Sequence, residues 1–189
     1  MKTKQKSLYT VCECAVFIAL AVALSFFEIK IGVFGGSIDF TMIPLFILCY
    51  RHGAKYGFLS CFVFSLVYVV AGGKASWGLL GVLLDYILAY TVLGVASLFA
   101  GKKAFVEVSV LVACLARFCI HFVTGITLWA ITTESTAMGI TTSNVYLYSL
   151  LYNIAYMLPN TVIAVVAMSL LRIPLQKLQS RGALHLNTK

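Results

Sequence analysis

The stretch of sequence that decides the fold is residues 78–99, which reads GLLGVLLDYILAYTVLGVASLF. It contains one charged side chain, Asp85, and about 20 predominantly apolar residues of helix are enough to cross the hydrocarbon core of a bilayer. Similar stretches cover residues 9–27, 40–50, 54–71, 104–131 and 146–171. The pattern predicts six membrane helices. The second would extend only about 17 Å, so it would span the bilayer only with help from its neighbours.

The composition agrees with this interpretation. The 189 residues are 61% hydrophobic and 11% charged, with a mean hydropathy of +0.99, whereas soluble domains are about 45–50% apolar and about 25% charged. Six spans and their loops use up the length. We therefore expect one integral membrane domain over residues 1–189, an all-α helical bundle whose functional site lies within the membrane.

The net charge of +8 is best explained by topology and not by a nucleic-acid partner. Basic residues cluster in residues 2–6, 51–55, 102–103 and 172–181. Because cytoplasmic segments carry an excess of Lys and Arg, the clusters predict that both termini are cytoplasmic and that the number of spans is even. The expected location is the cell membrane.

Several classes of activity lack their motifs. The sequence has no G-x-x-x-x-G-K-[ST] loop to hold a nucleotide, no H-E-x-x-H metal motif and no G-x-S-x-G nucleophile motif. The six cysteines lie in apolar stretches without zinc spacing. We expect no enzymatic activity, no metal and no cofactor, and any ATP hydrolysis must come from partner subunits.

Polar residues from three predicted helices reach a similar depth. Asp85, followed by Tyr86, lies about 10 Å below the outer end of its helix, and His121 lies about 15 Å below the outer end of the next helix. A carboxylate within a span costs about 2.5–3.5 kcal/mol, which indicates a function. The alternative is structural: Asp85 forms a buried ion pair with Arg117 or His121.

Aromatic and amide side chains are expected to join this level from the outer side: Trp129, Tyr148 and Asn153. Taken singly, a histidine is often a satisfied core residue, and a tryptophan or tyrosine is often an interface anchor. A carboxylate surrounded by aromatic faces nevertheless suits a flat organic cation, because each cation–π contact contributes about 0.5–2 kcal/mol. The outer loops at 34–37, 71–77 and 132–144 could cover such a site.

The ordered motifs resemble the thiamine-specific S components of energy-coupling factor (ECF) vitamin transporters. The resemblance rests on Gly35-Gly36-Ser37, Leu83-Leu84-Asp85-Tyr86, Arg117 with His121, Tyr148 with Tyr152-Asn153, and Pro159. It implies a six-helix bundle that captures thiamine from outside and associates with a transmembrane T component and two ATPases.

The resemblance also implies site residues. Asp85, Tyr86, His121, Trp129, Tyr148 and Asn153 match the substrate-binding positions, with Phe34, Gly35, Trp77, Arg117 and Tyr152 as lid or supporting residues. We expect Asp85 to neutralise the thiazolium charge, Tyr148 and Asn153 to hydrogen-bond the aminopyrimidine, and Trp129 to stack on the ligand. Some family members carry a glutamate at the position of Asp85, and some carry a tryptophan near Gly35, where this chain has only Phe34.

Ala15, Ala19 and Ala23 form a stripe of small residues on the first helix, which allows another helix to approach closely. The stripe could contact the chain's own bundle or a partner, and the resemblance favours the T component. Two other functions stay open: an autonomous proton-coupled transporter that uses Asp85 and His121 as a relay, and an intramembrane enzyme that uses them as acid and base.

Overall fold

The computed structural model describes residues 2–31, 36–72, 78–99, 106–128 and 134–187. Four long helices are α1 (Lys2–Ser25), α2 (Met42–Gly72), α5 (Val106–Thr127) and α6 (Val145–Asn187). The stretch 78–99 forms a further rod from α3 (Gly78–Gly81), η2 (Val82–Leu88), α4 (Ala89–Thr91) and η3 (Val92–Phe99). In these ranges, five helices are long and apolar enough to cross a membrane. The chain is therefore a multi-pass membrane protein.

The predicted helices 40–50 and 54–71 both fall in α2, which changes direction at Gly53. The backbone there has φ 70° and ψ −170°, a region open essentially only to glycine. Cys49 and Cys61 lie on either side, and their sulfur atoms are 3.9 Å apart, whereas twelve residues of straight helix would separate them by about 18 Å. The two parts of α2 therefore fold back on each other as a helical hairpin.

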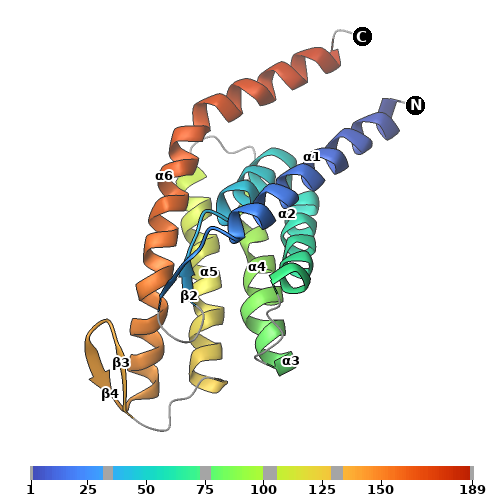
Figure 1. The fold of residues 1–189 in the computed structure, drawn as a ribbon. Helices are drawn as coiled ribbons and strands as arrows, with labels where there is room; N and C mark the ends of the chain where they lie inside the picture. The colour runs from blue at the N-terminus through green and yellow to red at the C-terminus, as the bar shows by residue number, and fades with distance from the viewer. Residues whose placement is uncertain (1, 32–35, 73–77, 100–105, 129–133, 188–189) are drawn as a thin grey trace.

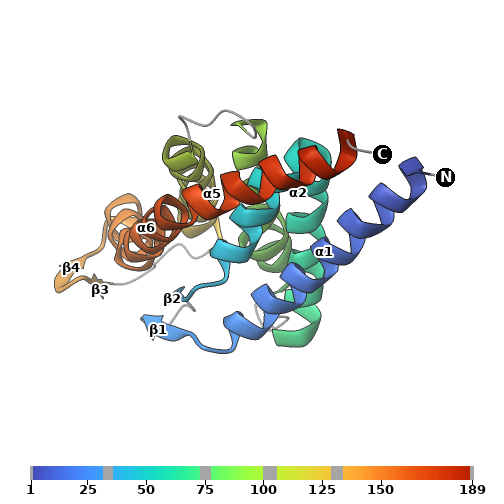
Figure 2. The ribbon, with the colours of Figure 1, turned by 90° about the horizontal axis from the view of Figure 1, so that it is seen from above.

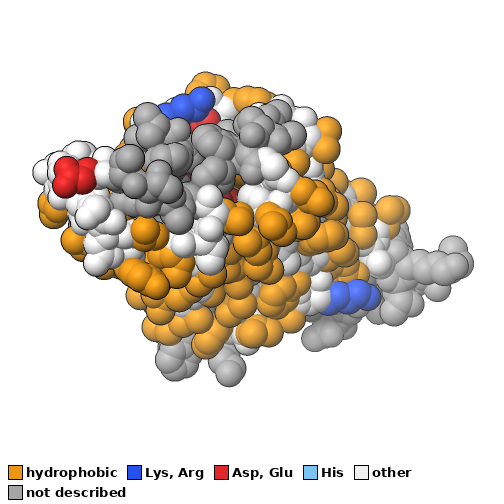
Figure 3. All heavy atoms as spheres, turned by 90° about the horizontal axis from the view of Figure 1, so that it is seen from below, with side chains coloured by type: hydrophobic (Ala, Val, Ile, Leu, Met, Phe, Trp, Pro, Cys, Tyr) orange, Lys and Arg blue, Asp and Glu red, His pale blue; other side chains and the backbone are white. Residues whose placement is uncertain are grey.

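Both ends of the chain lie at the same end of the bundle, and the β-strands and α3 lie toward the other (Figures 1 and 2). Viewed from the end with α3 and the β3–β4 hairpin (Figure 3), the visible sides carry mostly hydrophobic side chains and few charged ones. Many large apolar residues on α1, α2, α5 and α6 are exposed, as expected where lipid covers the surface.

The interior is formed mainly by α2, the 78–99 rod, α5 and α6. Phe64 of α2 packs edge-on against Tyr90 of α4 with ring centroids 4.9 Å apart, and both side chains are buried. By contrast, α1 packs on the outside of α2. It buries Cys14, Ala21 and Ser25 and leaves Ala15, Ala19 and Ala23 exposed. The alanine stripe is thus exposed, and Ala15 and Ala19 line a groove between α1 and α2.

The structure contains two β-hairpins that the sequence pattern did not predict. β1 (Ile29–Ile31) pairs with β2 (Gly36–Ile38), and β3 (Ser135–Ala137) pairs with β4 (Ile140–Thr142). Met138 and Gly139 join β3 to β4 with positive φ values of 52° and 78°, as in a type I′ turn. Both hairpins fall within segments that the sequence analysis treated as loops, because strands of three residues are too short to display an alternating pattern.

Helix α6 continues through Pro159. The next residue is Asn160, and its side chain holds β2 and the residue that follows this strand. Its Oδ1 accepts a hydrogen bond from the backbone N–H of Asp39 at 3.0 Å, and its Nδ2 donates to the carbonyl of Ser37 at 2.7 Å. Asn160 therefore fixes the β1–β2 hairpin to α6.

We expect Asn160→Ala to lower the free energy of unfolding by about 1–2 kcal/mol, because two backbone groups lose their partner and Asn160 is buried. Thermal unfolding of the detergent-purified protein measures the change. Thr127→Ala is the control, since the Thr127 hydroxyl is exposed and bonds only within its own helix. Equal melting temperatures for the two variants would contradict the role of Asn160.

Candidate functional site

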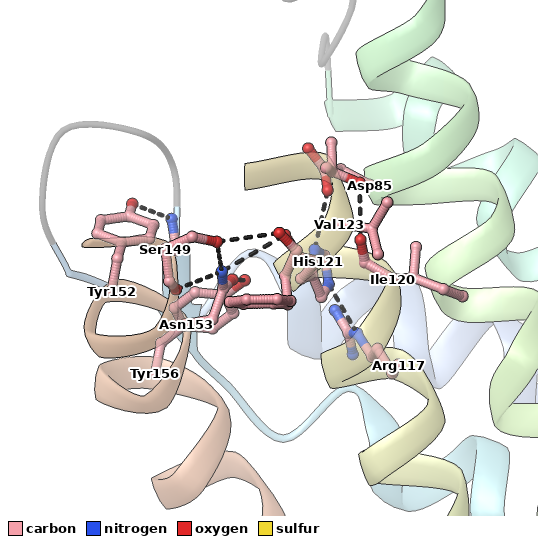
Figure 4. Close-up of polar contacts among 12 residues, drawn as sticks. Asp85, Arg117, Ile120, His121, Val123, Ser149, Tyr152, Asn153 and Tyr156 are labelled. Carbon is pink, nitrogen blue, oxygen red and sulfur yellow. Dashed lines mark hydrogen bonds and ion pairs between the residues drawn. The ribbon is translucent and has the colours of Figure 1, made fainter. Parts of the chain in front are cut away.

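A cavity lies near the end of the bundle that carries the β-hairpins, between the 78–99 rod, α5, α6 and β2. It is lined by residues from all four of these elements and one from α2: Gly36, Ser37, Tyr68, Asp85, Tyr86, Tyr90, Arg117, His121, Gly125, Tyr148, Ser149, Tyr152, Asn153 and Tyr156. Several of these side chains meet through the polar contacts drawn in Figure 4. The lining combines one carboxylate, one guanidinium, one imidazole and six phenol rings.

Asp85 lies in the middle of η2, a seven-residue π-helical segment. A π-helix widens the turn and often occurs at functional sites. The side chain of Asp85 is 17% exposed, which is low for a carboxylate. The neighbouring Tyr86 also lines the cavity, with its ring centroid 5.9 Å from that of Tyr68 on α2.

Asp85, His121 and Arg117 form a chain of hydrogen bonds. Nδ1 of His121 lies 3.0 Å from Oδ1 of Asp85, and Nε of Arg117 donates to Nε2 of His121 at 3.2 Å. The guanidinium carbon of Arg117 also lies 4.0 Å from the ring centroid of Tyr90. Asp85 and His121 thus lie at the same level of the bundle, as their positions along the two helices predicted. Their contact is also the one that the alternative to ligand binding requires, in which Asp85 pairs with His121.

Asn153 connects α5 to α6 at the centre of the cavity wall. Its Nδ2 donates to the carbonyl of Ser149 at 2.8 Å and lies 3.4 Å from the carbonyl of His121, and its Oδ1 accepts from the Tyr156 hydroxyl at 2.6 Å. A Cβ atom on Gly125 would overlap Oγ of Ser149. The absence of a side chain at Gly125 therefore lets α5 approach α6 closely beside Asn153.

Tyr152 joins α6 to both strands of the first hairpin. Its hydroxyl accepts from the backbone N–H of Gly36 at 3.0 Å and lies 3.2 Å from the carbonyl of Ile31, to which it donates. These two residues are paired across the hairpin. A Cβ atom on Gly36 would lie 2.5 Å from the ring of Tyr156, so only glycine allows β2 to lie this close to α6.

We expect Tyr152→Phe to speed ligand dissociation about fivefold, which corresponds to about 1 kcal/mol for the lost hydrogen bonds. The β1–β2 hairpin would keep its sequence and its hydrogen bonds to Asn160, but it would lose those to the Tyr152 hydroxyl. Stopped-flow dissociation measures the rate. The matched control is Tyr146→Phe on the same helix, where the residue is 65% exposed. A dissociation rate equal to that of the control would contradict this role of Tyr152.

Six tyrosines line the cavity together with Asp85: Tyr68, Tyr86, Tyr90, Tyr148, Tyr152 and Tyr156. The rings of Tyr148 and Tyr152 are stacked with centroids 5.9 Å apart, and Tyr156 meets the imidazole of His121 edge-on at 5.9 Å. Aromatic faces attract cations most strongly where water is excluded. The cavity is therefore suited to a flat, positively charged organic ligand.

The structure brings together every predicted site residue that it describes. Asp85, Tyr86, His121, Tyr148 and Asn153 all line the cavity, as do the predicted supporting residues Arg117 and Tyr152. Trp129, Phe34, Gly35 and Trp77 lie outside the described residues. That the lining residues bind a ligand stays a prediction.

Sequence reasoning did not assign a role in the site to several lining residues: Gly36, Ser37, Tyr68, Tyr90, Gly125, Ser149 and Tyr156. The spacing of Tyr152 and Tyr156 on one helix face, continuing to Asn160, was a usable signal. No signal in the sequence distinguishes Tyr68 and Tyr90 from ordinary core tyrosines. Among the described residues, no cluster of three or more His, Cys, Asp or Glu could hold a metal ion.

Comparison with known proteins places this cavity in a family context. A family model described as thiamine transporter protein matches residues 11–180. The thiamine transporter ThiT of Bacillus subtilis (strain 168) is 29% identical over 186 residues, covering 89% of this chain and 92% of that protein. The thiamine transporter ThiT of Lacticaseibacillus paracasei is 26% identical, covering 89% of both chains.

A solved structure of ThiT from Listeria monocytogenes has a similar fold. Its TM-score is 0.78 at 23% sequence identity, and the match covers 92% of this chain and 98% of that one. The arrangement of helices described above is therefore a known membrane fold.

Proposed function

Since the chain belongs to the thiamine transporter protein family, whose members are not enzymes, we propose that it is the thiamine-binding S subunit of an ECF transporter. In this role it captures thiamine from outside the cell and delivers it for ATP-driven uptake. The observation that carries the proposal is the half-buried carboxylate of Asp85 in a cavity that six tyrosines line.

Thiamine offers the matching chemistry. Its thiazolium ring is permanently cationic and its aminopyrimidine ring is flat and carries hydrogen-bonding groups. Asp85 supplies the opposite charge, while Tyr86, Tyr148 and Tyr152 supply aromatic faces and hydroxyl groups. Trp129 and His121 complete the proposed stacking surfaces. Asn153 already binds the chain's own backbone and Tyr156, so it orients the wall in addition to its proposed bond to the aminopyrimidine.

Two features of the chain support the proposed partner subunits. It has no nucleotide-binding loop, and the small side chains of Ala15, Ala19 and Ala23 are exposed along α1. Small residues allow a second transmembrane helix to approach closely. We propose that this face of α1 contacts the T component, which joins the S subunit to two ATPases at the plasma membrane, with both of its termini cytoplasmic.

Ligand capture is tested by isothermal titration of the purified protein with thiamine. We expect saturable one-to-one binding of thiamine and no heat with riboflavin, which is flat but carries no positive charge. A folded protein that gives no heat with thiamine would overturn the assignment. In that case the same cavity should be tested with other flat organic cations.

The mode of energy coupling is tested separately by uptake of labelled thiamine into proteoliposomes. An S subunit gives uptake only when the T component, the ATPases and ATP are present. An autonomous proton-coupled transporter, the second candidate because Asp85 and His121 are in contact, gives uptake on its own that stops when the proton gradient is dissipated. The two outcomes exclude each other, and neither depends on the binding assay.

A further inference from the structure

The hydrogen bonds on either side of His121 determine where its proton lies. Nε of Arg117 carries a hydrogen and has no lone pair to offer, so it can only donate. Because it donates to Nε2 of His121 at 3.2 Å, Nε2 must be unprotonated. The single ring proton then lies on Nδ1, which is 3.0 Å from the carboxylate oxygen Oδ1 of Asp85.

An imidazolium does not fit this arrangement. A protonated histidine carries hydrogens on both ring nitrogens, so Nε2–H and the N–H of Arg117 would point at each other. His121 and Arg117 are each only 8% exposed, so water does not readily replace the lost hydrogen bond. Arginine remains charged at all relevant pH values, which means that pH does not release the constraint.

The groups around His121 come from several elements. Asp85 approaches from η2, Tyr156 from α6 with its ring edge-on, and Arg117 from one turn earlier in α5. Tyr90 of α4 lies under the guanidinium, and Asp39, at the start of the connection to α2, acts electrostatically on the same group. Arg117 therefore interacts with an aromatic ring and a carboxylate in addition to His121.

We propose that Arg117 is a positioning residue that holds His121 as the neutral Nδ1–H tautomer. The cavity then presents a carboxylate and no imidazolium to a cationic ligand. The proposal deepens the proposed function and rests on it for the identity of the ligand. It also opposes a proton relay, because a relay requires His121 to gain and lose a proton.

The tautomer is tested without ligand by NMR of the ¹⁵N-histidine-labelled protein between pH 5.5 and 8. The signals of His121 are those missing from His121→Gln. We expect a neutral ring with its proton on Nδ1 and no titration over this range. A proton on Nε2, or conversion to an imidazolium within the range, would overturn the proposal whatever the ligand is.

The consequence for binding is tested by thiamine titrations over the same pH range. Wild type should change affinity less than about twofold. In Arg117→Met, Nε2 of His121 loses its donor and can accept a proton at low pH, so affinity should be about tenfold weaker at pH 5.5 than at pH 8. Arg172→Met is the matched control, because Arg172 contacts Glu107 away from the cavity.

The outcomes separate the two proposals. A flat pH profile in Arg117→Met, or an equally steep pH profile in the control Arg172→Met, overturns the role of Arg117. If Arg117→Met does not fold, the NMR spectrum of the wild type decides. A wild type that shows the Nδ1–H tautomer but binds no thiamine at any pH upholds the tautomer and overturns the proposed ligand.

Discussion

Asp85→Asn is expected to weaken thiamine binding by about 100-fold or more. Asparagine keeps the shape of the side chain and an oxygen that accepts the bond from Nδ1 of His121, so the change removes mainly the negative charge. A charge-assisted contact to a cation in a water-poor cavity is worth about 3 kcal/mol, or about 100-fold in the dissociation constant. Isothermal titration at constant ionic strength measures the loss.

The control for this variant is Glu107→Gln. Glu107 is also a carboxylate on a membrane helix, but it contacts Ser169 and Arg172 and does not line the cavity. The variant Glu107→Gln should bind thiamine with the affinity of the wild type. Unchanged affinity in Asp85→Asn, with a normal unfolding curve, would mean that the carboxylate serves the bundle and not the ligand, as the ion-pair alternative holds.

Gly53→Val is expected to lower the free energy of unfolding substantially. With φ at 70° and ψ at −170°, the backbone lies where a β-branched residue is a strong outlier, at a cost of about 2–3 kcal/mol. No atom lies within 4 Å of the position that a Cβ would occupy. The cost is therefore one of backbone conformation and not of collision.

Reaction with a thiol reagent measures opening of the α2 hairpin. Cys12 and Cys119 are exposed and should react at once in every variant, whereas Cys49 and Cys61 are buried between the two arms of α2. We expect the slow phase from the buried thiols to accelerate in Gly53→Val. The neighbouring Ala54→Ser, at an exposed helical position, should react like the wild type. If Gly53→Val also reacts at the wild-type rate, the α2 hairpin does not depend on the backbone conformation of Gly53.

The sequence predicted the membrane class and the depth of the polar residues well. A membrane helix advances 1.5 Å per residue along an axis that crosses the bilayer, so counting from the helix ends places Asp85 and His121 at one level. Their contact at 3.0 Å confirms that estimate. The break between the predicted helices 40–50 and 54–71 also coincides with the reversal at Gly53. The prediction of six spans and of their orientation in the membrane stays a prediction.

The rotation of each helix about its own axis was decided only by tertiary structure, because it depends on which side chains of the neighbouring helices fill the space between them. This is why Tyr68, Tyr90 and Tyr156 line the cavity although their sequence context resembles that of core tyrosines. The β1–β2 hairpin likewise depends on Tyr152 and Asn160, more than 110 residues away. The depth of a residue follows from its position along a single helix, so the local sequence is enough to predict it. The closure of a cavity needs contacts between segments that are distant in the sequence.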